Sequence, residues 1–258
     1  MIIFLNGQFA EENKATISIS DRGLTLADGV FDTLLVINGN LQYGQQHFTR
    51  LRKHADVIRI SIKHDTEELE QIADKLLKEN NFKDGAYALR TTITRGIGGR
   101  GLTLPEHSKP TIIMKATPVT IESSPPPVNA MIARNVKRNE NSPLSRIKSL
   151  NYGDNLIALM EAQDKGFDDA IMLNSAGNIT CTTTGNIFIR EGESMITPPL
   201  SDGVMDGITR QVIIEEKGAK QESISEDRLI YADEVLITNS IRGIRTVSRS
   251  SIENKSAA

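Results

Sequence analysis

Residues 146–156 read Arg-Ile-Lys-Ser-Leu-Asn-Tyr-Gly-Asp-Asn-Leu, and this stretch carries the strongest pointer to the fold. Lys148 stands between the apolar residues Ile147 and Leu150, directly before a predicted helix. Two interpretations of this lysine follow from the pattern. Most lysines are solvated surface groups. A partly buried lysine instead has a lowered pKa, and its neutral amine can form a Schiff base with a carbonyl compound.

A cluster of prolines precedes this stretch, in Ser123-Ser124-Pro125-Pro126-Pro127. Because proline fixes φ and has no N–H to donate to a strand ladder, the cluster indicates a stiff connector. We therefore predict a smaller N-terminal α/β domain over 1–122, a proline-rich linker over 123–128 and a larger C-terminal domain over 129–258. A chain of 258 residues is long enough to bury one large core or two.

Strand and helix signals alternate after the linker. Asp154 is a candidate N-cap for a helix that runs to about Lys165 and is stopped by Gly166. A second helix is predicted over 208–217, between two glycines. Strands are predicted over 170–173, 178–181, 186–190 and 234–238, and the tail over 253–258 is predicted to be frayed.

The first third of the chain mixes strands with two amphipathic helices. Apolar residues at helical spacing predict one helix over 47–60 and a second over 66–77. Asn38-Gly39-Asn40 predicts a hairpin of 30–36 with 41–43, because glycine tolerates a positive φ. Further strands are predicted over 2–5 and 15–19, around a turn at 11–13, and over 87–94 and 111–116.

The composition excludes several classes of protein. Charged residues make up 24% of the chain, hydrophobic residues 38%, and the formal net charge is −3, values typical of a folded globular protein. With no basic block, a role on nucleic acid or an anionic membrane surface is unsupported. The lone Cys181 cannot form an intramolecular disulfide. No apolar run reaches spanning length and the N-terminus does not resemble a signal peptide, so we expect a cytoplasmic protein with no membrane partner.

A glycine-rich segment lies at Gly96-Ile97-Gly98-Gly99-Arg100-Gly101. It matches the G-x-G-x-x-G pattern, but a dinucleotide site also needs a helix directly after the glycines. Prolines at 105 and 110 predict a loop there instead. Such a loop is either a flexible connector or a device that presents Arg100 to a carboxylate, with the glycines leaving room for a ligand.

Other kinds of site find little support in the sequence. The histidines, at 47, 54, 64 and 107, are scattered, and with Cys181 alone no metal-ligand spacing appears, so we expect no metal site. His47 and His54 lie on a polar helix and are expected to be solvated. No Gly-x-Ser-x-Gly elbow points to a hydrolase.

Five short motifs, in order, resemble the class IV aminotransferase family of pyridoxal-phosphate enzymes. This family includes branched-chain aminotransferases, D-amino acid aminotransferases and aminodeoxychorismate lyases. The motifs are Asp28-Gly-Val-Phe-Asp-Thr33, His47-x-x-Arg50-Leu51, Lys148-Ser-Leu-Asn-Tyr152, Thr184-Gly-Asn-Ile-Phe188 and Gly207-Ile-Thr-Arg210. The resemblance runs nearly from end to end. It implies an α/β (α+β) fold of two domains, known as fold type IV, with pyridoxal 5'-phosphate in the cleft between them and a homodimeric assembly.

The resemblance also assigns roles to residues. Lys148 would be the Schiff-base lysine and the proton shuttle. Arg50 would bind the cofactor phosphate as a fixed, charge-assisted fork. Ile208 and Thr209 begin a helix whose N–H groups and dipole suit a phosphate dianion. Asn239 and Ser240 follow a strand and can donate to phosphate or, for Asn239, to substrate. From the residue pattern alone, without the resemblance, Arg50 would be interpreted as a solvated charge on a helix and Thr209 as an ordinary residue at a helix start.

Two local features resemble the lyase branch of the family. The loop Arg95-Gly-Ile-Gly-Gly-Arg-Gly101 is similar to the lyase pattern, which implies that Arg100 holds a substrate carboxylate. The turn Thr238-Asn-Ser240 is similar to the lyase version as well. D-amino acid aminotransferases trap a carboxylate with a Tyr, an Arg and a His, and the matching positions here are Phe31, Arg100 and Leu102.

One position departs from the whole family. A glutamate normally stands five residues before the Asn of the Gly-Asn-Ile-Phe stretch and pairs with the protonated pyridine nitrogen. Here that position is Cys181, and a thiol is a weak partner. We therefore expect a lyase that converts 4-amino-4-deoxychorismate to 4-aminobenzoate and pyruvate. Two alternatives stay open: an aminotransferase for D- or branched-chain amino acids, and a cofactor-binding homologue with little turnover.

Overall fold

The computed structural model describes residues 1–249 and 251, and the chain divides into two compact units. The first unit comprises Met1–Ile121 and Ile147–Asn151, and the second comprises Glu122–Arg146 and Tyr152–Ala258. The first segment ends beside the expected boundary at 122, while the short segment around Lys148 joins the first unit instead of the second. The predicted frayed tail over 253–258 lies outside the described residues.

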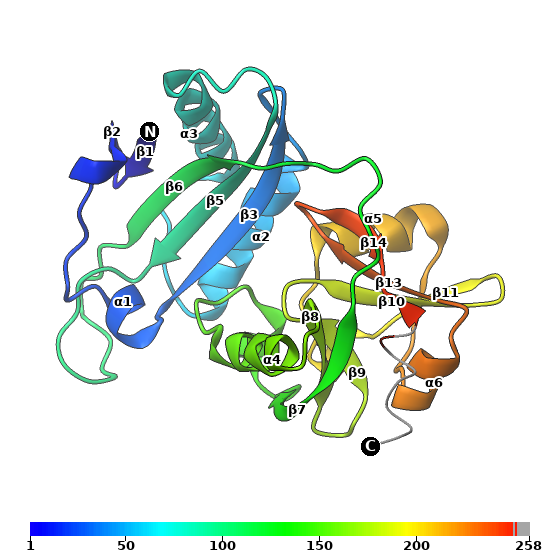
Figure 1. Cartoon of the computed structure of the whole chain (residues 1–258). Coiled ribbons are helices and arrows are strands. Elements are labelled where there is room, and N and C mark those ends of the chain that lie inside the picture. Colours follow the sequence, from blue (N-terminus) through cyan, green and yellow to red (C-terminus); the bar gives the residue numbers. More distant parts are fainter. Residues whose placement is uncertain (250, 252–258) are drawn as a thin grey trace. The chain divides into compact units, whose positions relative to one another are not determined.

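A six-stranded sheet forms the centre of the first unit, with the strand order β2-β1-β6-β5-β3-β4 (Figure 1). All of these neighbours are antiparallel. The strands are β1 (Ile2–Leu5), β2 (Gln8–Glu11), β3 (Gly29–Ile37), β4 (Asn40–Leu41), β5 (Ala86–Thr94) and β6 (Thr111–Pro118). The mixed α/β fold class predicted from the sequence is confirmed.

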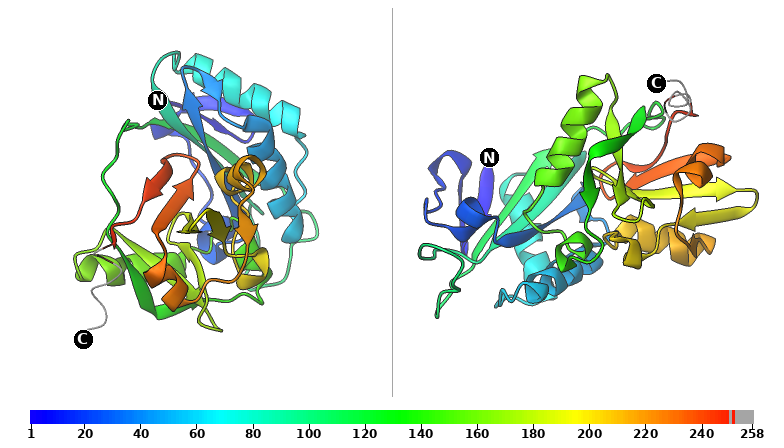
Figure 2. Two further views of the ribbon diagram at one scale, coloured as in Figure 1. Left: turned by 90° about the vertical axis from the view of Figure 1, so that its right-hand side faces the viewer. Right: turned by 90° about the horizontal axis from the view of Figure 1, so that it is seen from below.

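Two long helices, α2 (Gly44–Val57) and α3 (Thr66–Glu79), cover one face of this sheet (Figure 2). Phe48, Leu51 and Leu76 are fully buried there, in one cluster with apolar side chains of β3, β5 and β6. Asp65 and Glu68 form a capping box at the start of α3. A short helix, α1 (Arg22–Leu26), and a 3₁₀ turn, Glu12–Lys14, precede β3.

The first hairpin of the chain corrects one prediction. Residues 15–19 form no strand, and Ile19 is 84% exposed. The partner of β1 is β2, joined to it through Asn6 and Gly7, whose φ angles are 49° and 92°. Both central residues of a tight hairpin turn need a positive φ, which Asn-Gly supplies at low cost. The same geometry at Asn38 and Gly39 joins β3 to β4 and confirms the second predicted hairpin.

The second unit is built on an eight-stranded sheet (Figure 1). Its path runs β12-β11-β10-β9-β8-β7, and β13 pairs with β10 and with β14. The strands are β7 (Ala130–Arg138), β8 (Asp169–Asn174), β9 (Ile179–Thr182), β10 (Asn186–Glu191), β11 (Ser194–Thr197), β12 (Lys220–Gln221), β13 (Glu234–Asn239) and β14 (Gly243–Thr246). The predicted strands of this half are confirmed, while β7, β11, β12 and β14 add to them.

Three helices pack on this sheet: α4 (Gly153–Asp164), α5 (Ile208–Lys217) and α6 (Glu226–Tyr231). Ala158 and Ala162 of α4 are fully buried against β7 and β8. Asp154 lies in the first turn of α4 and is not its N-cap, which is Tyr152. Gly207 and Gly218 bound α5 as predicted. Short 3₁₀ turns lie at Pro143–Arg146 and Leu200–Asp202.

No helix within residues 1–249 and 251 combines the length and apolarity that a membrane span needs.

Candidate active site

Lys148 lies in a short segment that pairs with the start of β3. Phe31 N–H donates to the Lys148 carbonyl at 2.9 Å, and Leu150 N–H donates to the Gly29 carbonyl at 3.0 Å. Gly29 is needed for this close approach, because a Cβ there would lie 2.8 Å from Leu150 Cδ1 and 2.5 Å from the Ile93 carbonyl oxygen. The pairing therefore fixes the main chain of the half-buried Lys148 against the sheet of the first unit.

The aromatic ring of Phe31 carries two cationic neighbours. Lys148 Nζ lies 4.6 Å from the ring centroid, and the Arg90 guanidinium carbon lies 3.7 Å from it. Cations are attracted to the negative face of an aromatic ring at such distances. Phe31 is buried, so its ring gives the lysine amine an apolar, electron-rich neighbour.

A histidine of α2 contacts the main chain of the same lysine. His54 Nδ1 accepts a hydrogen bond from Lys148 N–H at 3.0 Å. Burial of the ring is the main cause that lowers the pKa of His54 to about 4. The positive charges of Arg50 and Lys148 also lower this pKa, while the negative charge of Asp32 raises it. The expectation that His54 is solvated is wrong, since only 7% of the residue is exposed. The neutral ring therefore works as an acceptor.

Arg50 lies one turn earlier on α2, in a buried charge cluster. Its Nε and Nη2 donate to the two carboxylate oxygens of Asp32 at 2.8 and 2.7 Å, and His47 Nδ1 lies 2.8 Å from Asp32 Oδ1. Burial works to raise the pKa of Asp32, but the Arg50 charge and the His47 contact hold it well below its usual value. His47 is 1% exposed, so its predicted solvation is also wrong. The first unit thus places Phe31 beside Lys148 and pairs Arg50 with Asp32, the residue next to Phe31.

Arg100 lies in the glycine loop, which contains no helix between β5 and β6. The loop prediction is confirmed, and the dinucleotide interpretation loses the helix that it requires. Arg22, 3% exposed, donates to the carbonyls of Gly101, Leu102 and Thr103 at 3.1, 3.5 and 3.3 Å. The side chain of Arg100 is exposed beside these anchored residues.

Arg22 is itself fixed by a half-buried carboxylate. Its Nε donates to Asp28 Oδ2 at 2.8 Å, and Arg95 binds both oxygens of Asp28 at 2.7 and 2.9 Å. Burial raises the pKa of Asp28, yet hydrogen bonds from the two guanidinium groups lower it overall. Gly98 packs directly on Arg22, because a Cβ there would lie 2.4 Å from Arg22 Cδ. Sequence reasoning missed this network, although Asp28 is the first residue of the first family motif.

In the second unit, Cys181 lies on β9 opposite Asn186 of β10. It is buried in an apolar cluster with Met131, Ala133, Ala158, Ala162, Ala170 and Met172. Its sulfur lies 3.6 Å from the Thr180 hydroxyl. The thiol therefore has neutral surroundings and brings no negative charge to this part of the sheet.

The N-terminus of α5 holds two more predicted residues, Ile208 and Thr209. No side chain caps the helix at Gly207. A Cβ on Gly207 would lie 2.1 Å from Asn186 Oδ1, so glycine is required where the helix meets β10. Asn186 Nδ2 in turn donates to the Met205 carbonyl at 2.9 Å. An uncapped helix start of this kind can offer its N–H groups to an anion.

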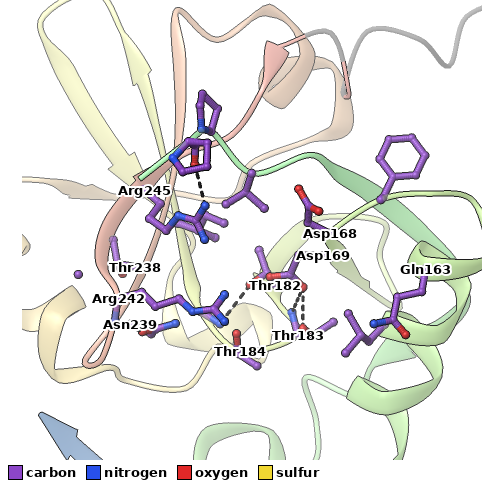
Figure 3. Close-up of a pocket in the computed structure, with 18 residues that line it drawn as sticks. Gln163, Asp168, Asp169, Thr182, Thr183, Thr184, Thr238, Asn239, Arg242 and Arg245 are labelled. Carbon is purple, nitrogen blue, oxygen red and sulfur yellow. Dashed lines mark hydrogen bonds between the residues drawn. The ribbon is translucent and has the colours of Figure 1, made fainter. Parts of the chain in front are cut away.

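A cavity of about 590 Å³ opens in the second unit, lined by the loop Thr182–Gly185, the end of β13 and residues of α4 (Figure 3). Asn239 lines it, whereas Cys181, Ile208, Thr209 and Ser240 are not among its lining residues. Asn239 Oδ1 accepts from Ile241 N–H and Arg242 N–H at 3.1 and 2.8 Å. This leaves the Asn239 amide NH₂ to serve as a donor.

The ionic groups of this cavity differ in how they are held. Asp169 accepts from the hydroxyl and N–H of Thr183 at 2.6 and 3.2 Å, as the dashed lines in Figure 3 mark. Arg245 donates to the Pro126 carbonyl at 2.7 Å, and Arg242 is exposed. The Asp169 carboxylate is thus occupied by hydrogen bonds to the loop Thr182–Gly185, while Arg242 and Arg245 place positive charge at the cavity.

The sequence was compared with models of known protein families. The model described as amino-transferase class IV matches residues 29–250. The chain belongs to this family.

Relatives of this class IV protein differ in their named activities. A protein named "Putative branched-chain-amino-acid aminotransferase" from Methanocaldococcus jannaschii is 34% identical over 244 residues, covering 92% of this chain and 84% of that one. The aminodeoxychorismate lyase of Bacillus subtilis is 30% identical over 245 residues, covering 93% and 83%. The branched-chain aminotransferase structure from Thermoproteus uzoniensis superposes with a TM-score of 0.90 at 24% identity, covering 96% and 86%. The last likeness shows the fold alone, and the predicted fold type is confirmed.

Class IV aminotransferases use pyridoxal 5'-phosphate, so the predicted cofactor is confirmed at the level of the family. The donor groups of each unit fit this molecule. The first unit offers the half-buried amine of Lys148 for the aldehyde and a buried guanidinium, Arg50. The second offers the uncapped start of α5, whose dipole suits a dianionic phosphate.

Proposed function

We propose that this class IV family member is a pyridoxal-phosphate-dependent lyase that converts 4-amino-4-deoxychorismate to 4-aminobenzoate and pyruvate. The observation that carries the proposal is the apolar, neutral environment of Cys181, at the position where the family keeps a glutamate. An anion beside the ring nitrogen stabilises its protonated, electron-withdrawing form. Amino transfer depends strongly on that form, whereas an elimination that creates an aromatic ring has its own driving force.

The proposed reaction needs no second substrate. The ring carbon that bears the amino nitrogen loses its hydrogen as a proton, the bond from the neighbouring ring carbon to the enolpyruvyl oxygen breaks, and the electron pair of the C–H bond completes the aromatic ring. The released enolpyruvate takes up a proton at carbon to become pyruvate. All atoms of both products therefore come from 4-amino-4-deoxychorismate.

Lys148 is the proposed catalytic residue. When bound, the cofactor supplies the carbonyl group that engages the substrate amine and an electron-accepting ring. Lys148 Nζ then takes the proton from the ring carbon next to that nitrogen, as a positioned general base. Phe31 lies 4.6 Å from Nζ and gives the amine an apolar neighbour. Borohydride reduction should fix the cofactor to Lys148, and fixation to another lysine would overturn the assignment.

Several groups have proposed binding roles. Arg50, Ile208, Thr209 and Ser240 bind the cofactor phosphate, Cys181 lies near the pyridine nitrogen, and Asn239 donates its amide to cofactor or substrate. Arg100 holds a substrate carboxylate, with Phe31 against the substrate ring. The loop is anchored by Arg22, which leaves the Arg100 guanidinium exposed to receive an anion. Phe31 and Leu102 lack the polar groups of an α-carboxylate clamp for amino acids.

A comparison of rates tests the function. Purified protein loaded with cofactor is given 4-amino-4-deoxychorismate, and pyruvate is followed with lactate dehydrogenase while 4-aminobenzoate is followed by fluorescence. In parallel, amino transfer from D-alanine and from L-leucine to 2-oxoglutarate is measured. We expect the elimination to be faster by at least about tenfold, a difference of roughly 1.4 kcal/mol in barrier. Amino transfer as the faster reaction would overturn the proposal.

The second candidate is an aminotransferase for branched-chain or D-amino acids. The observation in its favour is the 34% identity to the Methanocaldococcus jannaschii protein, which bears a branched-chain aminotransferase name. The same assays separate it from the lyase. Failure of both reactions, with cofactor bound to Lys148, would favour a homologue with little turnover. The homodimer and the cytoplasmic location stay predictions.

A further inference from the structure

The main chain of Lys148 is hydrogen-bonded on both of its polar groups. The Phe31 N–H donates to its carbonyl at 2.9 Å, and its own N–H donates to His54 Nδ1 at 3.0 Å. The first bond is an ordinary strand pairing that any residue at position 31 except proline would make. The second depends on the side chain at position 54. His54 is therefore a side chain that substitution can remove without breaking the pairing with β3.

The hydrogen bond determines the protonation state of the histidine. A backbone N–H can only donate, so Nδ1 must present its lone pair to Lys148. The neutral ring then carries its proton on Nε2, and a doubly protonated ring could not make this contact. The charged groups that face the ring are Arg50 on its own helix, Asp32 on β3 and Lys148 itself.

The placement of His54 links two parts of the candidate site. It follows Arg50 by four residues on α2, so the two side chains leave adjacent turns of the same helix face. α2 is packed on the sheet through Phe48, Leu51 and Ala55, all fully buried. A rigid helix thus holds the acceptor for Lys148 N–H and the guanidinium expected to bind phosphate.

We propose that His54 is a positioning residue for Lys148: its ring holds the Lys148 main chain at a set distance from α2 and thereby aims the lysine amine. The inference rests on the proposed function, in which Lys148 is the reacting amine. His54 does not touch the reacting atoms itself. Its effect on the reaction passes through the main chain of the lysine, and a backbone displacement of one ångström at a catalytic group can cost about a hundredfold in rate.

Two substitutions separate this role from simple packing. His54→Leu fills a similar volume but has no acceptor. His54→Asn is smaller, yet its side-chain oxygen can accept near the position of Nδ1. A packing role predicts that leucine is the better replacement, whereas a positioning role predicts that asparagine is. His64→Leu is the matched control, because His64 lies after α2, with 35% of its side chain exposed, and its Nδ1 lies 3.6 Å from the exposed Glu68 carboxylate.

The first measurement is amide hydrogen exchange of the holoenzyme, read at the Lys148 N–H by mass spectrometry. We expect exchange at this amide to rise about tenfold or more in His54→Leu and to stay near the wild-type rate in His54→Asn and His64→Leu. Unchanged exchange in His54→Leu would overturn the proposal. Should His54→Leu fail to fold, the wild-type protein answers the question: below about pH 4 the protonated ring should release the Lys148 amide, after correction for intrinsic exchange.

The second measurement reports on the lysine amine. In His54→Leu we expect kcat to fall at least about tenfold with KM nearly unchanged, and asparagine to restore most of it. The visible absorption of the bound cofactor and the rate of its borohydride reduction should shift in the same variant. Wild-type absorption and kcat in His54→Leu would overturn the proposal even if exchange rises. If the wild-type protein shows no lyase activity, the absorption and reduction measurements still test His54, so the two failures are distinguishable.

Discussion

At the residue scale, the ring of His54 lies where protonation is opposed by burial and by two cations. Only 7% of the residue is exposed, and the pKa of the ring is lowered from 6.5 to about 4. The unfolded chain binds the proton at the higher value and the folded protein only at the lower one. Stability is therefore fully present above pH 6.5 and is lost as the pH falls toward 4.

This linkage gives a prediction for stability against pH. Between pH 7 and pH 5, the shift of His54 should cost about 2 kcal/mol of unfolding free energy. His54→Asn keeps the acceptor and removes the titration, so its loss between these pH values should be smaller by about that amount. Urea unfolding at both pH values measures the difference, with His64→Asn as the control. An identical pH slope in wild type and His54→Asn would contradict the assigned state of the ring.

Cys181 gives a second prediction at this scale. Glutamate in its apolar cluster would be an unpaired buried charge, so Cys181→Glu should lower the melting temperature of the cofactor-free protein. On the proposed placement of residue 181 near the pyridine nitrogen, the carboxylate would gain a cationic partner when the cofactor is bound, so amino transfer should rise while elimination changes less. Thermal melting with and without cofactor, and the half-reaction with an amino acid, measure both effects. Cys181→Ser is the neutral control, and destabilisation without any gain in amino transfer would remove the argument for the lyase.

The roles of Lys148, Arg50 and Cys181 stay predictions, whereas the solvation predicted for His47 and His54 is wrong. Polar neighbours on α2 suggested solvation for His47 and His54. The sequence also held a contrary signal. Each histidine directly precedes a residue at an apolar position of the helix, Phe48 after His47 and Ala55 after His54. Burial of a polar side chain depends on a partner far away in the chain, here Asp32 for His47 and the Lys148 amide for His54. No local pattern contains such a partner.

At the scale of elements, the sequence predicted most helices and strands but missed what connects them. The hairpin at Asn6-Gly7 has a recognisable turn signal that was outweighed by the acidic stretch after it. The loop after β5 was predicted as a loop, yet its anchoring by Arg22 could not be seen. Arg22 is separated from the carbonyls it binds by 79 to 81 residues.

Arg22 should keep the glycine-rich loop over 96–101 ordered. Arg22→Met keeps the length of the side chain and removes the hydrogen bonds that Arg22 itself donates to Asp28 and to the carbonyls of Gly101 and Thr103. We expect trypsin to cut after Arg100 at least about tenfold faster in this variant, since cleavage of a native loop follows its local opening. Arg138→Met is the control, because it removes hydrogen bonds from an arginine to the carbonyls of Ser145 and Gly203 in the second unit. Unchanged cleavage after Arg100 would show that the loop is ordered without Arg22.

The start of α5 should tolerate no side chain at Gly207. Gly207→Ala places a methyl group 2.1 Å from Asn186 Oδ1, so the amide must rotate and lose its bond to Met205. We expect a loss of about 1–3 kcal/mol in unfolding free energy and weaker cofactor retention. Gly153→Ala at the start of α4 is the control, because nothing lies within 4 Å of its Cβ, and its effect should stay within about 1 kcal/mol. Equal stability of the two variants would contradict the close contact.

At the scale of the whole molecule, the proline cluster lies just after the first segment of the first unit, which ends at Ile121. It gives no indication that the first unit has a second segment. The segment Ile147–Asn151 returns to the first unit, where it pairs with β3. A linker signal is local, while this return depends on the fit of Gly29 against Leu150. The order of the five motifs predicted the family, and the family model that matches residues 29–250 confirms it. The choice between elimination and amino transfer lies beyond those shared motifs, and rests here on Cys181.

The most direct test of the lyase proposal is the balance of products. Purified holoenzyme is incubated with 4-amino-4-deoxychorismate at increasing concentrations of 2-oxoglutarate, starting from none, and 4-aminobenzoate, pyruvate and glutamate are quantified by chromatography. Elimination predicts equal amounts of 4-aminobenzoate and pyruvate at a rate that does not depend on the oxo acid, no glutamate, and loss of both products in Lys148→Ala. Product formation that requires 2-oxoglutarate and yields glutamate would contradict it.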